Sequence, residues 1–382
     1  MRLRIQDAPL VTPNGVVDQT LTFDDRSGRI LPPDAIRPDR RIGLAGYMLL
    51  PGLVNAHDHL ELNHFPRTKF REVYPNAHIW GEEVSAQLGN PPFAALRSYP
   101  LRDRCWIGGI KNLLAGVTTV AHHNPLHRPL RSTQFPVRVI RRYGWAHSLH
   151  FETPGHLLKS YQPGRPWIIH LAEGTDEIAA KELRRLAAMN LLTADTILVH
   201  GVGLTPEDAH YAIEKGAGLV WCPSTNAYLL GQTTDVRPWV RAGRVALGSD
   251  SRLTADGDLL DELRAAPEIE GVDVTTLFRL VTDYAARVLS IPGAGALTPG
   301  SHADIVVLRY QDHPHSALVK TRRRDIGLVI RGGKVMFGDP EIVQRFPGEF
   351  RPILLDGQRK LMARQLVRGL QKSRLSEPGL VL

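Results

Sequence analysis

Cysteine is scarce in this sequence: the 382 residues include only Cys105 and Cys222. Two thiols in so long a chain exclude a disulfide framework, and we expect a reducing, cytoplasmic location. Long apolar runs are also lacking. The longest run, residues 42–54, is interrupted by glycine and proline and falls short of the ~20 residues of a membrane span. The opening residues MRLRIQD have no apolar segment behind their charges, so they predict no secretory signal.

Lysine is rare among the basic residues, at nine of 47, although the net charge is +8. A basic excess can indicate nucleic-acid binding, because cations neutralise phosphates. Here the arginines are scattered and no nucleic-acid-binding motif accompanies them. We therefore expect a basic solvated surface, a small-molecule substrate, and neither a nucleic-acid nor a membrane partner. The hydrophobic content of 43% is typical of a globular chain.

Both ends of the chain have the pattern of short strands separated by turns. Residues 3–5 and 16–23 show it near the start, and residues 303–308, 326–330 and 334–337 show it again late in the chain. Neither end has enough strands for a core of its own. We therefore predict a composite β-sandwich domain built from residues 1–50 and 296–345, with a second domain inserted between them.

The middle of the chain, residues 51–295, alternates apolar β-branched runs with amphipathic segments. This alternation predicts an α/β fold with a parallel sheet covered by helices, and eight such runs predict a (β/α)8 TIM barrel. The predicted strands are Leu53–Ala56, Val117–Ala121, Val137–Ile140, Trp145–Leu149, Trp167–Leu171, Thr196–His200, Gly218–Cys222 and Val245–Gly248.

Helices are predicted after several of these strands, at Thr175–Ala188, Thr205–Lys215, Leu259–Ala266 and Val274–Leu289. Residues 122–166 are too few for two complete strand–helix units, so at least one connecting helix there should be missing or reduced to a loop. Residues 346–382 are predicted as a C-terminal helical extension, with helical periodicity at Arg359–Arg374. This helix is a candidate contact with the barrel or with the partner in a homodimer.

Metal-binding side chains stand at the carboxyl ends of the predicted strands, where barrel active sites form. His57 and His59 follow the first strand two residues apart, so their side chains point to the same face. His170, His200 and Asp250 stand at the ends of three later strands. Each alone has an ordinary explanation as a core, loop or capping residue. Together, in chain order, they predict one site for a divalent metal, and imidazole with carboxylate suits Zn²⁺ or Fe²⁺.

Glu173 lies three residues beyond His170, within reach of a water at such a metal. A carboxylate there can take a proton from the water and return it to a leaving nitrogen. Its ordinary explanation is an acid in the first turn of the following helix. Beside the histidines we favour the catalytic role.

These motifs resemble the amidohydrolase superfamily, in particular its branch of metal-dependent cytosolic deaminases and chlorohydrolases that act on triazines and cyclic amidines. The matching segments are LPGLVNAHDH at 50–59, GVTTV at 116–120, HLAE at 170–173, VHG at 199–201, WCPSTN at 221–226, GSD at 248–250 and LTPG at 297–300.

The resemblance implies a single metal ion held by His57, His59, His170 and Asp250, with Glu173, His200 and Asp250 as catalytic residues. A binuclear relative would carry a lysine at a mid-barrel strand end, and none lies between Lys111 and Lys159. Zn²⁺ is the expected ion, with Fe²⁺ as the alternative. Asn226 corresponds to a substrate contact, although this chain has Ser-Thr-Asn where the family more often has Arg-Ser-Asn.

Three further residues are candidates for lining the substrate pocket. His122 and His123 follow the second strand, and Trp80 lies in the long loop after the first strand, where a lid or stacking residue is common. Each also has an ordinary packing explanation. Cys222, on a buried strand, is expected to be an apolar filler rather than a nucleophile.

The predicted activity is hydrolytic deamination of a small nitrogen-rich heterocycle by a metal-bound hydroxide, which makes the chain a hydrolase of carbon–nitrogen bonds other than peptide bonds. Ring opening of a cyclic amide or imidazolone, and dechlorination of a triazine, are alternatives at the same site. A metal-free barrel that serves for binding or assembly is the alternative from a different class.

Overall fold

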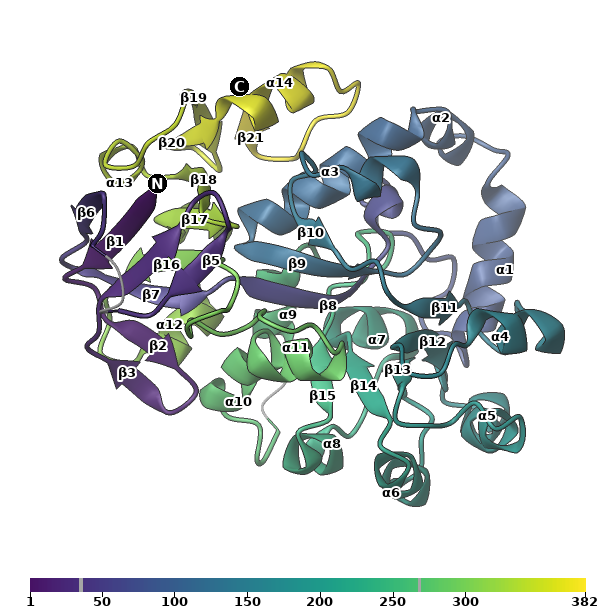
Figure 1. The fold of residues 1–382 in the computed structure, drawn as a ribbon. Coiled ribbons are helices and arrows are strands. Elements are labelled where there is room, and N and C mark those ends of the chain that lie inside the picture. Colours follow the sequence, from purple (N-terminus) through teal and green to yellow (C-terminus); the bar gives the residue numbers. More distant parts are fainter. Residues whose placement is uncertain (34–36, 267–268) are drawn as a thin grey trace.

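The protein is described by a computed structural model over residues 1–33, 37–266 and 269–382. All eight predicted central strands are present within it (Figure 1). They pair in parallel in two sheets, in the orders β8-β9-β10 and β11-β12-β13-β14-β15. Their bounds are β8 Leu53–Asp58, β9 Val117–His122, β10 Arg138–Val139, β11 Gly144–Ala146, β12 Trp167–Leu171, β13 Thr196–His200, β14 Gly218–Trp221 and β15 Val245–Leu247.

Helices flank these strands and bury their apolar sides. In α5, for example, the Asp176 side chain accepts a hydrogen bond from the amide of Ala179 and caps the helix, while Leu183 and Leu186 are buried. The helices of this part are α1 Ala77–Gln87, α2 Phe93–Arg97, α3 Leu101–Leu114, α4 Pro154–Ser160, α5 Glu177–Ala188, α6 Pro206–Glu214, α7 Pro223–Leu230, α8 Arg237–Ala242, α9 Leu259–Ala265, α10 Val274–Leu280 and α11 Asp283–Val288, with short 3₁₀ turns η1 Leu60–Leu62 and η2 Arg128–Arg131.

The crowded region 122–166 has lost connecting helices, as predicted. Only the turn η2 separates β9 from β10, and β11 follows β10 after four residues, 140–143. The predicted strand Trp145–Leu149 is shorter than expected. It ends at Ala146 because the chain then turns, with the Ser148 hydroxyl accepting from the amide of Phe151.

The predicted single helix Val274–Leu289 is in fact two helices, α10 and α11. The break falls at Val281 and Thr282, where the Val281 carbonyl accepts a hydrogen bond from the amide of Val54 at the start of β8. The break therefore coincides with a hydrogen bond that joins this segment to β8.

The strands of the two chain ends combine in two further sheets, of orders β5-β4-β1-β6 and β21-β19-β20-β18-β17-β16-β7-β2-β3. The predicted segment 16–23 supplies two strands to different sheets. The bounds are β1 Arg2–Gln6, β2 Leu10–Thr12, β3 Gly15–Val17, β4 Leu21–Asp24, β5 Arg29–Leu31, β6 Arg40–Gly43, β7 Tyr47–Pro51, β16 Ile305–Arg309, β17 Leu328–Arg331, β18 Lys334–Gly338, β19 Phe350–Leu355, β20 Gln358–Ala363 and β21 Leu380–Val381.

These two sheets share one apolar cluster that includes Ile5 and Phe23 from one sheet and Leu49, Ile305 and Ile330 from the other. β7 then runs directly into β8, which connects this part to the central strands. Figure 1 shows the chain-end sheets on one side of the molecule and the central strands on the other. The remaining helices are α12 Pro314–Lys320, α13 Pro340–Val343 and α14 Arg364–Gln371, with the turn η3 Arg323–Asp325.

The prediction of a purely helical C-terminal extension is wrong. Residues 358–363 form strand β20, which pairs with β19, so the helix begins at Arg364 and not at Arg359. The alternating burial of β20 puts Lys360 and Met362 inside, where pairing with β19 satisfies the backbone.

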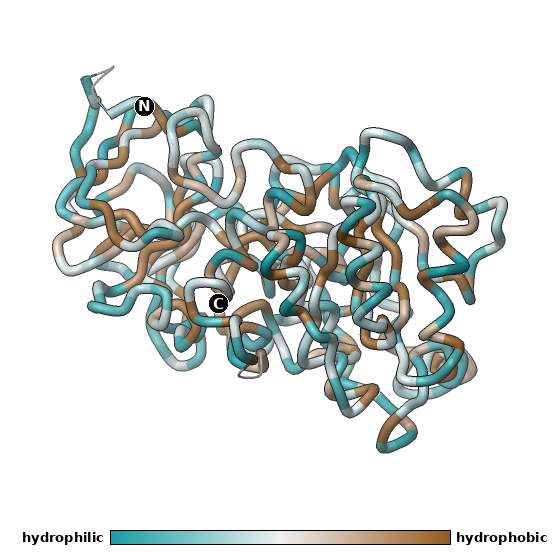
Figure 2. Tube along the Cα trace, turned by 90° about the horizontal axis from the view of Figure 1, so that it is seen from below, coloured by the Kyte–Doolittle hydropathy of each residue, from teal (hydrophilic) through white to brown (hydrophobic). Residues whose placement is uncertain are grey.

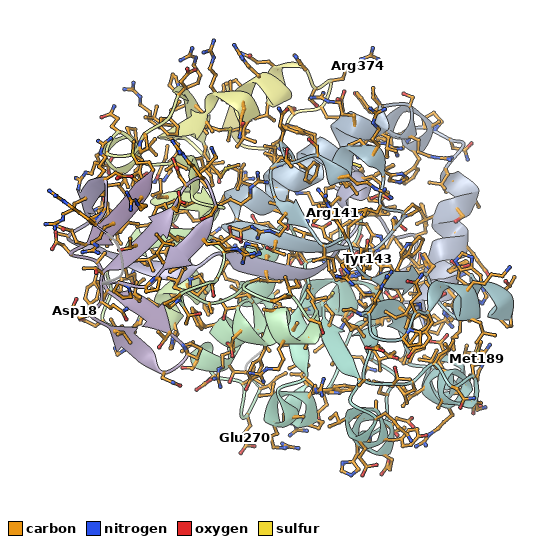
Figure 3. The ribbon with its side chains drawn as sticks, viewed as in Figure 1. Asp18, Arg141, Tyr143, Met189, Glu270 and Arg374 are labelled. Carbon is orange, nitrogen blue, oxygen red and sulfur yellow. The ribbon has the colours of Figure 1, made fainter. Side chains whose placement is uncertain are left out.

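Hydropathy follows the expected inside–outside division. Figure 2 shows hydrophobic segments running through the interior and hydrophilic turns along the outline. The labelled side chains of Asp18, Glu270 and Arg374 project from the outline in Figure 3. Among the helices that the structure describes, none combines the length and the apolar character that a bilayer crossing requires.

Candidate metal centre

The predicted polar side chains come together at the carboxyl ends of the central strands. His57 and His59 lie at the exit of β8, His170 and His200 at the ends of β12 and β13, and Asp250 three residues beyond β15. Two of these exits have left-handed backbone, with φ of 72° at His200 and 50° at Asp250. Non-glycine residues are strained there by about 1–3 kcal/mol, and such strain concentrates at functional sites.

The separations of the candidate ligand atoms suit one ion. Nε2 of His57 lies 3.3 Å from Nε2 of His170 and 3.7 Å from Oδ1 of Asp250, and Nε2 of His59 lies 3.6 Å from the same oxygen. Two ligand atoms that are each about 2.1 Å from a tetrahedral ion are about 3.4 Å apart. These three separations match that spacing, and imidazole nitrogens with a carboxylate oxygen are donors that suit a divalent transition metal.

Close backbone approach brings the first and last central strands together at this site. The amide of Asp250 donates to the carbonyl of His57 at 3.0 Å. Gly248 permits the approach, because a β-carbon at this position would stand 2.7 Å from Cβ of His57. A larger residue at 248 would separate the two strand exits that supply three of the four candidate ligands.

The protonation states also suit a metal centre. Burial lowers the pKa of His57, His59 and His170, so their rings are neutral and carry the lone pairs that a metal requires. Burial alone would raise the pKa of Asp250, but the contact with His57 and the neighbouring imidazoles bring it well below its usual value. The site thus presents neutral imidazoles and one anionic carboxylate.

Residues absent from the sequence predictions hold Asp250 in place. Its Oδ2 accepts from the hydroxyls of Thr225 at 3.2 Å and Thr254 at 3.0 Å, and its Oδ1 accepts from the amide of Ser251 at 2.8 Å. Thr225 lies inside the WCPSTN motif, so the sequence could have identified it as a residue of the site. Thr254 has no such signal, because its role depends on the turn after β15.

His200 and Glu173 face each other beside the ligands, with 3.5 Å between Nε2 and Oε1. His200 Nδ1 makes a 2.8 Å hydrogen bond to Oδ1 of Asn226, which leaves Nε2 directed at Glu173. Asn226 is fully buried, so it contacts the site through His200. Burial lowers the pKa of His200, and its Nε2 is therefore an acceptor.

Glu173 has the properties of a proton donor. Burial, and then the charge of Asp250, raise its pKa well above the usual value. Its loop is fixed on both sides: the amide of Ala172 donates to Glu182 at 2.7 Å, and the amide of Ala77 donates to the Glu173 carbonyl at 2.8 Å. Glu182 was not predicted, although it lies inward on the amphipathic helix α5.

The three predicted pocket-lining residues lie in different surroundings. His122 is buried with Nδ1 accepting from the amide of Leu60, and its carbonyl accepts from the hydroxyl of Tyr143, labelled in Figure 3. His123 packs against the rings of His57 and His170. The prediction that Trp80 lies in a loop is wrong: it lies on α1, packs against an apolar cluster with Phe65, and donates to the carbonyl of Thr68 at 3.0 Å. Cys222 is a buried free thiol, and burial raises its pKa, consistent with a filler.

A buried ion pair lies directly behind the ligands. Nζ of Lys111, on α3, is 2.9 Å from Oδ2 of Asp58, and neither side chain has exposed surface. Lys111 also donates to the carbonyl of Asp250 at 3.2 Å, and Asn63 and Asn112 donate to Asp58. A lone lysine in the apolar segment CWIGGIKNLL was the available signal for this network.

The model of the amidohydrolase family matches residues 156–336, the part that contains His170, Glu173, His200 and Asp250. The chain is 26% identical over 353 residues to the 5-methylthioadenosine/S-adenosylhomocysteine deaminase of Teredinibacter turnerae, covering 74% of this chain and 78% of the relative. The protein of that name from Halobacterium salinarum is 24% identical, with 89% and 94% covered.

The resemblance to the amidohydrolase superfamily is therefore confirmed. Solved structures agree on the fold. A zinc-bound adenosine deaminase from Xanthomonas campestris has a TM-score of 0.72 at 20% identity, covering 89% of this chain and 94% of its own. The zinc complex of the atrazine chlorohydrolase TrzN from Arthrobacter aurescens has a TM-score of 0.71 at 16% identity, covering 87% and 95%. The α/β amidohydrolase fold of this chain thus extends over most of its length.

Proposed function

We propose that this protein is a metal-dependent amidohydrolase that removes an amino group from a nitrogen-rich heterocycle by hydrolysis. One observation carries the proposal: imidazoles of His57, His59 and His170 and the carboxylate of Asp250 lie at ligand spacing, with Glu173, whose pKa is raised by burial, beside them. A binding scaffold has no physical need for this combination of a ligand set and a poised acid.

His57, His59, His170 and Asp250 are the proposed ligands of one divalent ion, with zinc favoured because the structural relatives named above carry it. When bound, such an ion supplies Lewis acidity that lowers the pKa of a water toward neutrality. The imidazole nitrogens and one carboxylate oxygen are a donor set that suits zinc.

The protein's own groups handle the protons. Asp250, anionic and oriented by Thr225 and Thr254, accepts the proton of the attacking water. Glu173, held neutral, donates a proton to the ring or leaving nitrogen of the substrate. His200 offers Nε2 as an acceptor that anchors an N–H or O–H of the reacting centre, because Asn226 engages its other nitrogen.

The proposed substrate class is a 6-aminopurine nucleoside. The sequence relatives named above are deaminases of 5-methylthioadenosine and S-adenosylhomocysteine, both of which bear an adenine. Hydrolysis at the amino-bearing carbon would release ammonia and leave a carbonyl on the ring.

For the architecture, we propose that the eight central strands, residues 51–295, form a (β/α)8 barrel, and that residues 1–50 and 296–345 form the composite β-sandwich. The hydrogen bond between Asp250 and His57 supports closure between the last and first strands. Two free, buried cysteines support the proposed cytoplasmic location. The substrate is proposed to be a small molecule. The buried face of α14 packs on Trp106 of α3 in the same chain, and a homodimer stays a proposal.

The test is an ammonia-release screen of the zinc-loaded protein over purine nucleosides, pyrimidines, pterins and triazines, with chloride measured in parallel. We expect stoichiometric ammonia from at least one 6-aminopurine nucleoside. Chloride without ammonia would replace deamination by dechlorination, and no product from any compound despite one bound zinc would contradict the proposed function.

A further inference from the structure

His123 is a buried histidine beside the proposed ligands that the four-ligand set does not use. Its ring stacks on His170 with 4.2 Å between centroids and meets the ring of His57 edge-on at 5.0 Å. Its ligating atoms lie close enough to those of His57, His59 and His170 to belong to one metal-binding group. It can therefore act either as a further ligand or as a support for a ligand.

The hydrogen bonds of His123 distinguish these roles. Its Nε2 lies 2.8 Å from the carbonyl oxygen of Ala146. A carbonyl only accepts, so Nε2 carries the hydrogen and, in a neutral ring, Nδ1 carries the lone pair. That Nδ1 lies 3.3 Å from Nδ1 of His57. A hydrogen bond between the two requires the hydrogen on the His57 nitrogen.

This arrangement fixes the free nitrogen of His57. With its hydrogen on Nδ1, His57 has its lone pair on Nε2, the atom that faces Oδ1 of Asp250 and Nε2 of His170. The lone pair of His123, by contrast, is used by His57 and is not available to an ion. The support role is the one that satisfies both rings.

The exit of β11 orients two rings through consecutive carbonyls. Ala146 accepts from His123, and the carbonyl of His147 lies 2.9 Å from Nδ1 of His170, which leaves Nε2 of His170 free in the same way. Within the described part of the chain, Nδ1 of His59 is buried without such a partner. β11 therefore contributes orientation to the site.

We propose that His123 is a positioning residue that holds His57 in the tautomer presenting Nε2 to a divalent ion, with the carbonyl of Ala146 as its anchor. The inference rests on the metal site of the proposed function. Carboxylates and carbonyls commonly orient metal-binding histidines, and removal of such a partner weakens metal affinity by about 10–100-fold. Here an imidazole takes that role for His57.

The test compares the wild type with His123→Phe and His123→Asn. Phenylalanine fills the space without an acceptor, whereas asparagine keeps an amide oxygen that can accept from His57. Zinc dissociation constants come from competition with a chelator, and the absorption of the cobalt-substituted protein reports on the ligand geometry. We expect about 10–100-fold weaker zinc binding and an altered cobalt spectrum for His123→Phe, with most of the affinity restored in His123→Asn.

The outcomes separate this inference from the function it rests on. Wild-type affinity in His123→Phe, or equal losses in both variants, would overturn the positioning role while leaving the metal site intact. A wild type that binds no zinc would instead remove the proposed function. If the variants do not fold, neutron diffraction from the zinc-bound wild type decides: deuterium on His123 Nε2 and His57 Nδ1 is expected, and deuterium on His123 Nδ1 would overturn the inference.

Discussion

Glu173 is the single residue on which the proposed proton transfers depend. It lies in a turn whose backbone is held from two sides, and burial raises the pKa of its carboxyl well above the usual value. Glu173 is not one of the proposed metal ligands. Catalysis and metal binding should therefore separate cleanly at this position.

Glu173→Gln should reduce kcat by about 10²–10⁴-fold, because an amide of the same shape cannot deliver the proton. Zinc content, measured by atomic absorption, should stay near one equivalent. Asp250→Asn is the matched comparison, and it should lose zinc together with activity. Loss of zinc in Glu173→Gln would show that Glu173 is a ligand instead.

The buried carboxyl of Glu262 should make the free energy of unfolding depend on pH. This carboxyl accepts from the amide of Ser224, and burial raises its pKa to about 8 from about 4.5 in the unfolded chain. The folded state thus binds a proton that the unfolded state releases, so the free energy of unfolding should fall as pH rises from 4.5 to 8, by at most about 1.4 kcal/mol per pH unit.

Glu262→Gln should reduce this slope, as measured by urea unfolding between pH 5 and 8, while the buried Asp258, whose pKa is raised to about 6, keeps part of it. Glu207→Gln, which removes an exposed carboxylate, is the control and should keep the wild-type slope. Identical slopes in wild type and Glu262→Gln would contradict the assignment.

At the scale of elements, the exits of the central strands could be predicted from the sequence with the greatest accuracy. β12 and β13 have the predicted bounds, because each is a continuous apolar run with a histidine as its last residue or the one before it. The break between α10 and α11 could not be predicted, because it coincides with a hydrogen bond from the distant Val54. β20 was misassigned for a related reason, since its pairing with β19 overrides local periodicity.

The site follows the same division. His57, His59, His170, His200 and Asp250 could be predicted because each stands at a strand exit. Lys111, Glu182 and Thr254 could not, because each acts through a partner that only the fold brings near.

The Lys111–Asp58 pair joins α3 to the exit of β8 and should show strong coupling. Lys111→Met should reduce the free energy of unfolding by about 3–5 kcal/mol, because it leaves Asp58 charged and buried. The double variant Lys111→Met/Asp58→Asn should recover much of this loss, since no uncompensated charge remains. Urea unfolding of the metal-free protein measures Lys111→Met, Asp58→Asn and the double variant. A loss in the double variant equal to the sum of the two single losses would contradict the coupling.

At the scale of the whole molecule, the C-terminal tail is fastened to the central part. Glu377 is buried, and its carboxylate pairs with Arg252 at 2.6 Å, two residues beyond Asp250, and with Arg323 at 2.7 Å. Arg252 and Glu377, which are 125 positions apart, thus meet in one ion pair. The tail should contribute to global stability.

Glu377→Gln should lower the free energy of unfolding by about 3–5 kcal/mol, because two arginines lose a buried partner. Glu349→Gln disrupts the solvent-exposed pair with Arg364 and should cost about 1 kcal/mol or less. Chemical denaturation of the two variants provides the comparison. Equal effects would show that the tail is not a structural clamp.

The most direct measurement is anomalous diffraction at the zinc edge from crystals of the metal-loaded protein. We predict one ion, with Nε2 of His57, His59 and His170 and a carboxylate oxygen of Asp250 each at about 2.0–2.2 Å. Two ions, or an ion without Asp250 or without any one of these histidines, would contradict the proposed centre.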